Sequence, residues 1–333
     1  MATYATVNDI QVKSLEMNSA YKNPCRMMTY TYPYLINDVG DTVTARIIRQ
    51  GNTSTVFYGN VKAVTRRRPE NIYEYACQDV LARAVEYYFS PETSLDNAYE
   101  VKNIDHITLV KNILSFATLT NFVSDWPAYN KYTAENTATF QFATGEKAVE
   151  IKIAAAWDVI GWICEITGSH VWADATGKVH LGLVWDEVAP SGETIYGAFT
   201  TGDTGNMKSV EYVRSDENLR NRMVIYGSGG ITYETHASSP WVVDPAFYKT
   251  GIISYDFIDT QEMAQVTGDI NLHRLNKLTE SCVIEALGDP SIDTSQVVTV
   301  TDSKCGLSGS WFLAQCKHTV SSSGYTMRMT GVR

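Results

Sequence analysis

Three short β-rich runs close the chain: Val297-Val298-Thr299-Val300, Trp311-Phe312-Leu313-Ala314-Gln315-Cys316-Lys317-His318 and Tyr325-Thr326-Met327-Arg328-Met329-Thr330-Gly331. A turn from Gly306 to Gly309 separates the first two, and Ser321-Ser322-Ser323-Gly324 separates the last two. Runs of this length between Gly and Ser clusters are typical of strands joined by hairpins. We therefore expect the chain to end in a barrel-like β-meander, which favours a building block over a catalyst.

The first 88 residues predict another β-domain. Residues 28–34 place Met and Tyr at alternate positions, and residues 42–48 repeat the alternation with aliphatic side chains. Alternation of this kind is typical of strands with one buried face. Residues 79–88 carry apolar side chains at helical spacing, and Asp79 stands where a helix cap is expected.

The middle third of the chain, residues 89–205, has a mixed character. Apolar side chains at helical spacing follow Asp105 and recur over residues 154–166. Gly168 is expected to end the second of these helices. A small hairpin is predicted over residues 170–181. This part is therefore expected to be an α/β region.

The β pattern returns after a Gly- and Thr-rich stretch at 197–205, which is typical of a linker. Asp259-Thr260-Gln261-Glu262 matches a capping box that would open a helix. The predicted fold is mainly β with an α+β insert. A tube-like β-barrel domain at 1–88 and a second one at 206–333, with a helical insertion, flank a mixed α/β insert domain at 89–205.

Composition and charge narrow the functional classes. The formal net charge of −10 argues against a protein that wraps nucleic acid, because such binding depends on Lys and Arg neutralising phosphates. The one basic run, Arg66-Arg67-Arg68 before Pro69, is either a solvated loop or a partner contact. Twenty tyrosines suit protein–protein contacts, and Tyr is also a favoured strand residue.

The six cysteines show neither a C-x-x-C pair nor a zinc spacing, so we expect reduced thiols. Cys305 and Cys316 could face each other across a hairpin, and the sequence does not decide whether they pair. The chain shows no signal peptide and no apolar run of membrane-spanning length, so no membrane insertion is expected.

Catalytic motifs are not evident. Gly227-Ser228-Gly229-Gly230 lacks the Lys of a Walker loop and the later Gly of a dinucleotide fingerprint. Gly306-Leu307-Ser308-Gly309-Ser310 resembles a nucleophile elbow, but Ser310 stands where the second Gly is required. His318 is expected to be a hydrogen-bonded strand residue rather than a ligand or base. We therefore predict no catalytic residue, no cofactor and no metal.

Several short motifs occur in the order typical of tail hub proteins. They include Phe57-Tyr58-Gly59-Asn60-Val61, the hairpin Asp174-Ala175-Thr176-Gly177-Lys178-Val179, and the strand that runs from Asn221 to Gly227. The chain thereby resembles the late control protein D and baseplate hub family of phages and contractile injection systems. The residues that carry this resemblance are Gly59, Asp79, Asp174, Gly177, Asn221, Gly227, Gly288, Asp289, Pro290, His318 and Gly324.

The resemblance also has its departures, since Asp293-Thr294-Ser295-Gln296 replaces the family's usual turn before the penultimate strand. It implies a structural homotrimer in a virion tail, assembled in the host cytoplasm. A tail tube protein would lie above it, and a spike or tip protein below it. Other baseplate or distal tail proteins would contact it, and DNA would pass through its lumen without specific binding.

Two alternatives remain open from the sequence. A tail-associated cell-wall hydrolase would need a pair of carboxylates or a metal site, which spacing alone cannot nominate. A carbohydrate-binding tail module would use exposed Trp and Tyr side chains to stack on sugars. Clearing of peptidoglycan or binding to a glycan array would reveal these activities.

Overall fold

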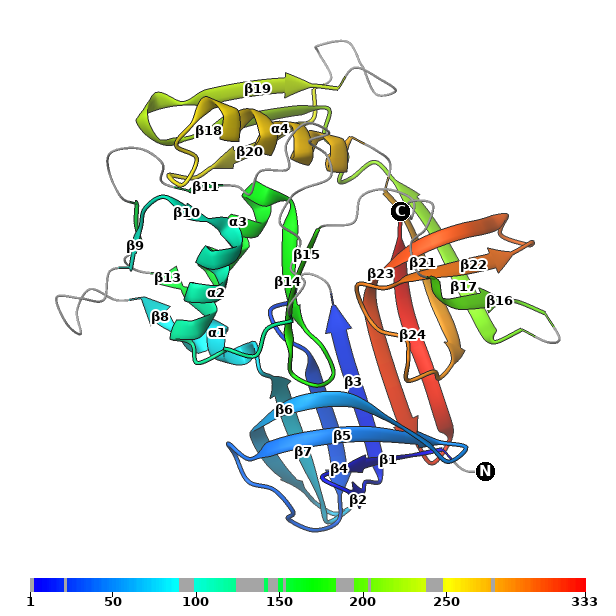
Figure 1. Cartoon of the computed structure of the whole chain (residues 1–333). Helices are drawn as coiled ribbons and strands as arrows, with labels where there is room; N and C mark the ends of the chain where they lie inside the picture. The colour runs from blue at the N-terminus through cyan, green and yellow to red at the C-terminus, as the bar shows by residue number, and fades with distance from the viewer. Residues whose placement is uncertain are drawn as a thin grey trace.

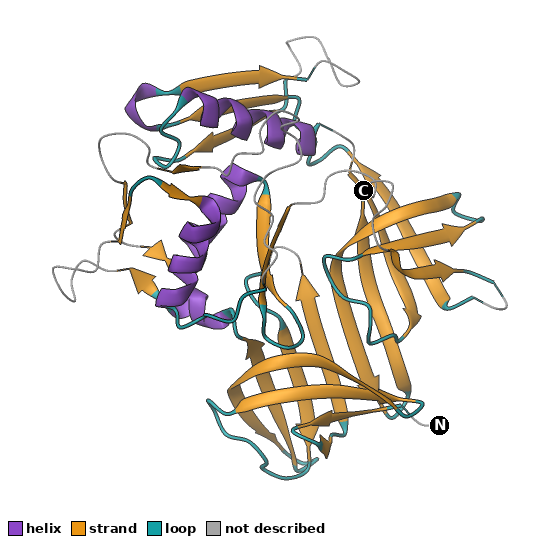
Figure 2. Ribbon diagram, viewed as in Figure 1, coloured by secondary structure: helices purple, strands orange, loops and turns teal. Residues whose placement is uncertain are grey.

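The structure is a computed structural model of the chain. It describes residues 3–20, 23–89, 99–123, 141–142, 149–151, 154–183, 195–202, 205–237, 248–276 and 279–333. Strands dominate, and the helices gather on one side of the molecule, away from the large sheet (Figure 2). The prediction of a mainly β fold with an α/β insert is confirmed. In the described part of the chain, every helix is too short or too polar to cross a bilayer.

The first β-region contains seven strands: β1 (Tyr4–Val7), β2 (Ile10–Gln11), β3 (Ser14–Ala20), β4 (Met27–Tyr32), β5 (Thr42–Arg49), β6 (Asn52–Arg67) and β7 (Ile72–Asp79). Alternate side chains enter its core, as in β5, where Val43, Ala45 and Ile47 are fully buried. This period of two is the one expected of a strand with one covered face. Tyr30 and Tyr75 stack on adjacent strands inside this core, with ring centroids 4.4 Å apart.

The second β-region contains six strands: β16 (Ile195–Thr200), β17 (Met207–Ser215), β21 (Thr279–Leu287), β22 (Val297–Asp302), β23 (Leu307–Ser321) and β24 (Gly324–Val332). The three runs that close the sequence are β22, β23 and β24, so the predicted meander is confirmed. Trp311 in β23 is fully buried inside the second β-region. Side chains of the two β-regions share one hydrophobic core.

The two β-regions have the same strand order. In the first it is β1-β5-β6-β7-β4-β3, and in the second β16-β22-β23-β24-β21-β17. The order of the strands along the chain is also the same, which agrees with an internal duplication. One difference stands out: β1 runs antiparallel to β5, whereas β16 runs parallel to β22.

The two β-regions meet edge to edge. Residues 315–320 of β23 pair antiparallel with residues 15–20 of β3. Together the described strands of both regions form one sheet of thirteen strands (Figure 1). We call the β3–β23 contact the in-chain seam.

The α/β region lies between the two β-regions in the sequence. Its helices are α1 (Ala82–Glu86), α2 (His106–Phe116) and α3 (Ala156–Thr167), and its strands are β8 (Tyr88–Phe89), β9 (Tyr99–Val101), β10 (Ile104–Asp105), β11 (Gln141–Phe142), β12 (Val149–Ile151), β13 (Ala154–Ala155), β14 (Ser169–Ala173) and β15 (Val179–Leu183). As predicted, α2 begins after Asp105, whose side chain accepts a hydrogen bond from Thr108 N. Gly168 ends α3 in the left-handed conformation, at φ 65°.

A second α/β unit interrupts the second β-region. It contains β18 (Arg222–Tyr226), η1 (Ser228–Gly230), β19 (Thr232–His236), β20 (Thr250–Ser254) and α4 (Gln261–Leu275). Its core residues, such as Ile225 and Met263, belong to the same hydrophobic cluster as those of α2 and α3. The predicted helical insertion of the second β-region thus packs against the preceding α/β region.

Several predictions are corrected in detail. Residues 79–88 do not form one helix, because α1 covers only Ala82–Glu86 and Tyr87 is extended. The N-cap of α4 is Thr260, which accepts a hydrogen bond from Met263 N, rather than Asp259. The helix ends at Leu275.

The predicted linker is largely a strand. Residues 197–200 of β16 pair with β22, and a Cβ on Gly197 would lie 2.8 Å from Ile292 Cδ1. Gly is used at this position because the loop between β21 and β22, which contains Ile292, approaches β16 closely. The domain limits 1–88, 89–205 and 206–333 remain a prediction, but a boundary before β16 would follow the sheet better.

Candidate functional site

The place where the three parts of the chain meet is built around Arg26, just before β4. Its Nε donates a hydrogen bond to Ala173 O of the α/β region, at 3.0 Å, and its Nη1 lies 2.5 Å from Asp293 Oδ2 of the second β-region. Ser19 Oγ donates to the other oxygen of Asp293, at 3.2 Å. The Arg26 side chain is 7% exposed, so a single guanidinium joins three parts of the fold. We call these residues, with Asp79, the junction cluster.

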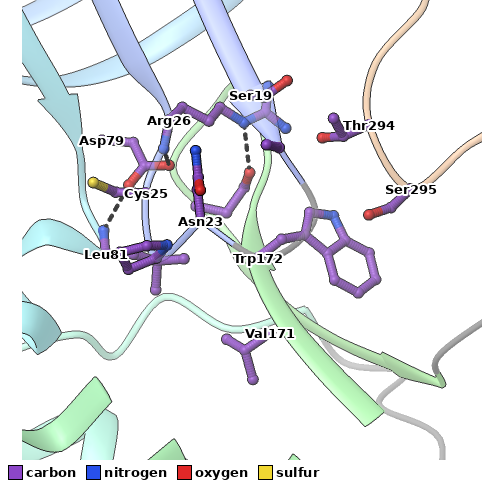
Figure 3. A pocket seen from close by; sticks show the side chains of 13 residues that line it. Ser19, Asn23, Cys25, Arg26, Asp79, Leu81, Val171, Trp172, Thr294 and Ser295 are labelled. Carbon is purple, nitrogen blue, oxygen red and sulfur yellow. Dashed lines mark hydrogen bonds between the residues drawn. The ribbon is translucent and has the colours of Figure 1, made fainter. Parts of the chain in front are cut away.

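Asp79 lies on the other side of Arg26, at the end of β7. Its carboxylate accepts hydrogen bonds from Arg26 N at 2.9 Å and from Leu81 N at 3.0 Å (Figure 3). Asp79 therefore holds the turn before α1 and does not cap the helix itself. Burial raises its pKa to about 6, against the opposing effect of these hydrogen bonds and of the Arg26 charge.

Gly59 faces Asp79 across the β6–β7 pair. A Cβ on Gly59 would lie 2.1 Å from Gln78 O, so only Gly fits this close crossing of two strands. The motif residues Gly59 and Asp79, which are apart in the sequence, are thus neighbours at one point of the sheet.

A second group of motif residues surrounds His318, inside the second β-region. His318 Nδ1 accepts a hydrogen bond from Tyr325 Oη at 2.7 Å, and its Nε2 donates one to Ile292 O at 3.0 Å. His318 is 1% exposed, and burial lowers its pKa. The predicted role as a hydrogen-bonded strand histidine matches this geometry, because a neutral ring satisfies both partners.

The loop after β21 packs against the same tyrosine. A Cβ on Gly288 would lie 2.2 Å from the Tyr325 ring. Gly288 O accepts a hydrogen bond from Arg49 Nη1 of the first β-region, at 2.7 Å. Asp289 turns the loop by accepting hydrogen bonds from Ser291 N and Oγ, and Pro290 lies within that turn.

The remaining motif residues shape turns elsewhere. Asp174 Oδ1 accepts from Thr176 N, and its Oδ2 lies 3.0 Å from His180 Nε2. Although burial opposes ionisation, these hydrogen bonds hold the pKa of Asp174 well below its usual range. Gly177 has a φ of +80°, and a Cβ there would lie 2.5 Å from the Tyr58 ring of β6.

Asn221 and Gly227 flank β18. The Asn221 side chain is buried and accepts a hydrogen bond from Lys249 N at 2.8 Å, which fixes the start of β20. A Cβ on Gly227 would lie 2.2 Å from Ile258 O. Gly324 has a φ of +118° in the β23–β24 turn, where its partner is Ser321. These positions lie apart from the junction cluster.

The junction cluster encloses little free space. Its cavity is about 20 Å³ and is lined by residues that include Ser19, Arg26, Asp79, Trp172 and Ser295. That volume holds about one water molecule and no substrate. The buried charges of the junction cluster therefore join the parts of the chain with almost no free space between them.

A larger hollow of about 260 Å³ lies between α3, β14 and α4. Trp157, Glu165, His170 and Arg274 are among its lining residues. Glu165 also accepts a hydrogen bond from Tyr255 Oη. Within the described ranges, no group of three or more His, Cys, Asp or Glu side chains could hold a metal ion.

All six cysteines are free thiols. Cys305 is exposed in the turn between β22 and β23, whereas Cys316 is buried in β23 beside His318. The two therefore do not face each other across a hairpin. The Gly306 to Ser310 segment forms that turn and the start of β23, and not a nucleophile elbow.

The sequence model of the YQBQ-like family matches residues 171–331. This segment runs from β14 to β24 and includes Asp293 and His318. No curated protein matches the chain.

Solved structures match the whole fold. The tail protein from Neisseria meningitidis MC58 aligns with a TM-score of 0.72 and 13% identity, over 100% of this chain and 97% of that one. The 43 kDa tail protein of prophage MuSo2 from Shewanella oneidensis aligns with a TM-score of 0.65 and 14% identity, over 100% and 98%. The chain thus has the fold of phage tail proteins.

The same fold occurs in secretion machinery. The E. coli c3393 protein is described as a component of the type VI secretion system with structural similarity to the T4 bacteriophage tail proteins gp27 and gp5. It aligns with a TM-score of 0.56 and 8% identity, over 98% of this chain and 76% of that one. At these identities, the likeness establishes the shared fold.

The sequence alone missed Arg26 and the role of Asp293. Asp293 belongs to the stretch that departs from the hub motif, and that stretch supplies the partner of Arg26. No local pattern marks Arg26, because its charged partner lies near the opposite end of the chain.

Proposed function

We propose that the chain is a structural subunit of a tail or baseplate hub in a phage or a related contractile injection system. The observation that carries this proposal is the likeness to the Neisseria tail protein over 100% of the chain. The order of the motifs around Gly59, Asp174 and His318 supports the late control protein D-like hub among tail proteins. Such a subunit works by shape and contact, and not by catalysis.

The subunit is a homotrimer in this proposal. Each chain carries two β-regions of the same strand order, so three chains present six similar units in a ring. Such a ring matches a sixfold tail tube above and a threefold spike or tip protein below, and no adaptor is needed. Obligate contacts of this kind usually bury more than about 2,000 Å².

The ring surrounds part of the channel for DNA or effectors. The net charge of −10 supports an acidic wall, which repels phosphates and lets DNA slide without specific binding. The particle is the virion tail, assembled in the host cytoplasm beside other baseplate or distal tail proteins. A lumen dominated by Lys and Arg would contradict this part of the proposal.

The test is the mass and symmetry of the purified protein. We expect a particle of three times the 37.0 kDa chain mass, and class averages with a threefold ring. Pull-down with tube and spike candidates from the same tail should capture at least one of them. A monomer that captures neither would refute the hub. Clearing of labelled peptidoglycan or specific glycan binding would instead favour the hydrolase or the carbohydrate module.

A further inference from the structure

The repeat of the two β-regions is found not only in strand order but also in the pairing registers of β6, β7, β4 and β3, which match those of β23, β24, β21 and β17. The pairing of β6 with β7 contains a bulge between Val61 and Ala63. The pairing of β23 with β24 contains a bulge between Leu313 and Gln315. When the bulges are superposed, Val61 matches Leu313, and both are fully buried. A bulge is a specific feature of a strand pair, so it fixes the alignment of the two halves.

The alignment holds when it is carried across the sheet. The strand pairings lead from β7 through β4 to β3, and from β24 through β21 to β17. They match Leu15 of β3 with Val210 of β17, and Met17 with Tyr212. All four side chains pack in the same hydrophobic core. Because a slip of one residue would turn these side chains to the opposite face, the register of the repeat is settled.

The in-chain seam uses one strand edge of each β-region. Because the two β-regions repeat each other, each of these edges has a counterpart in the other β-region, and the in-chain seam does not use these counterparts. The counterpart of β3 is β17, and the counterpart of residues 315–320 in β23 is the segment 63–68, which comprises the end of β6 and the residue directly after it. In the part of the chain that the structure describes, β17 pairs with β21 alone and β6 beyond residue 61 pairs with β7 alone. One chain therefore carries two matching strand edges that it leaves without a strand partner.

We propose that β17 of one copy pairs antiparallel with residues 63–68 of a second copy, in the register of the in-chain seam. The superposed registers place Thr65 opposite Val213 and Arg67 opposite Glu211. We call this contact the between-chain seam. It rests on the proposed trimer and names the strands that build it.

The charges at these positions fit. Arg67 and Glu211 are both exposed and would stand directly opposite each other on the outer face of the sheet. The in-chain seam has an ion pair on its outer face, between Lys317 and Glu16 at 2.7 Å. Cross-strand pairs of opposite charge stabilise a sheet. The basic run that includes Arg67 thereby becomes a partner contact.

The two strand edges without a partner also favour a contact between chains. Exposed edges with unpaired N–H and C=O groups promote aggregation, and proteins cover them or place charges on them. In a trimer, three between-chain seams would alternate with three in-chain seams and cover all of these edges. The contact is head-to-tail, so it closes only if the rotation per chain completes a ring.

The test is a disulfide trap. The pair Thr65→Cys and Val213→Cys would place the two Cβ atoms about 4.5–5.5 Å apart, within reach of a disulfide after small adjustment. The control is Thr65→Cys with Glu211→Cys, where the Cβ atoms would be diagonal neighbours about 7–8 Å apart. Both variants carry Cys305→Ser, which removes the exposed native thiol. All substituted positions are exposed, so the fold should be kept.

After mild oxidation, the matched pair should give covalent dimers and trimers on a non-reducing gel, in several-fold excess over the control. A trimer by mass without this excess would overturn the between-chain seam and leave the proposed function standing. A monomer by mass without cross-links would overturn both.

A charge variant provides a second measurement without cysteines. Glu211→Arg would face Arg67, so the dissociation constant of the trimer should rise about tenfold, which corresponds to about 1.4 kcal/mol. The matched control Glu100→Arg changes an exposed charge on β9. This strand pairs with β12 in a separate sheet and belongs to neither of the two edges. Equal dissociation constants for the two variants would contradict the proposed register.

Discussion

The carboxylate of Asp293 lies 2.5 Å from the guanidinium of Arg26, although one precedes β22 and the other precedes β4. The same guanidinium donates to Ala173 O in the α/β region. One buried cation therefore contacts both the second β-region and the α/β region, in addition to the strand pairing of the in-chain seam.

Arg26→Met tests these contacts. The change leaves the Asp293 carboxylate, which is 22% exposed, without its cation, and removes the donor to Ala173 O. Breaking a buried pair on one side is strongly destabilising, so we expect a loss of about 3 kcal/mol in the free energy of unfolding, measured with urea. The control Arg222→Met removes a pair with Glu234 that is about a third or more exposed, and should cost clearly less, because solvent screens an exposed pair. Equal losses would show that Arg26 is not special.

Asp79 should make stability depend on pH. Its pKa rises from the ordinary 3.8 to about 6 on folding, mainly through burial, so the folded state favours the protonated acid. This contribution is present below about pH 4 and is lost as the pH rises to 6, with a size of about 3 kcal/mol. Wild type minus Asp79→Asn, measured by urea unfolding at several pH values, should fall across this interval. A flat difference would refute the effect.

The exposed Asp216 serves as the control for that measurement. Its hydrogen bond with Lys249 lowers its pKa, so its contribution has the opposite sign and is lost as the pH falls. The difference between wild type and Asp216→Asn should therefore not decline between pH 4 and 6.

His318 should act in the other direction. Burial lowers its pKa from the ordinary 6.5, so the folded state favours the neutral ring. Stability is complete above about pH 6.5 and is lost as the pH falls below that value. The thermal midpoint of wild type relative to His318→Gln should drop between pH 7 and 5. His236→Gln, which changes an exposed histidine, provides the comparison. A drop of the same size relative to both variants would contradict the role of burial.

Two glycines should respond with opposite signs to the same substitution. Gly288→Ala would place a Cβ 2.2 Å from the Tyr325 ring, so we expect a loss of about 1–3 kcal/mol. Gly161→Ala adds a Cβ to an exposed position of α3 with no atom within 4 Å, and should stabilise the protein by up to about 1 kcal/mol. Urea unfolding of both variants measures the difference. A neutral Gly288→Ala would mean that the loop can move away from the ring.

Local patterns predicted most of the regular structure. The alternation over 42–48 became β5, and the apolar spacing over 154–166 became α3, because burial of one face acts within a few residues. The pattern failed at 197–205, where Gly and Thr suggested a linker. There the parallel partner β22 decides the structure, and it lies about a hundred residues further along the chain.

The junction cluster could be predicted only in part. The motif order identified Asp79, since an acidic residue after a strand is a local signal. Arg26 has no such signal, and its importance comes from its burial between Asp293 and Ala173. Contacts between distant segments depend on how the strands of the two β-regions pair, so they become visible only in three dimensions.

The reversed first strand of one half has a consequence for any ring of this chain. Since β1 is antiparallel to β5 while β16 is parallel to β22, the two halves can be told apart at that edge. In the proposed trimer, a neighbour that contacts this edge would meet two kinds of surface in alternation. A partner with true threefold symmetry could thus dock in one orientation and in those related to it by the threefold axis. It could not dock in the orientations midway between them.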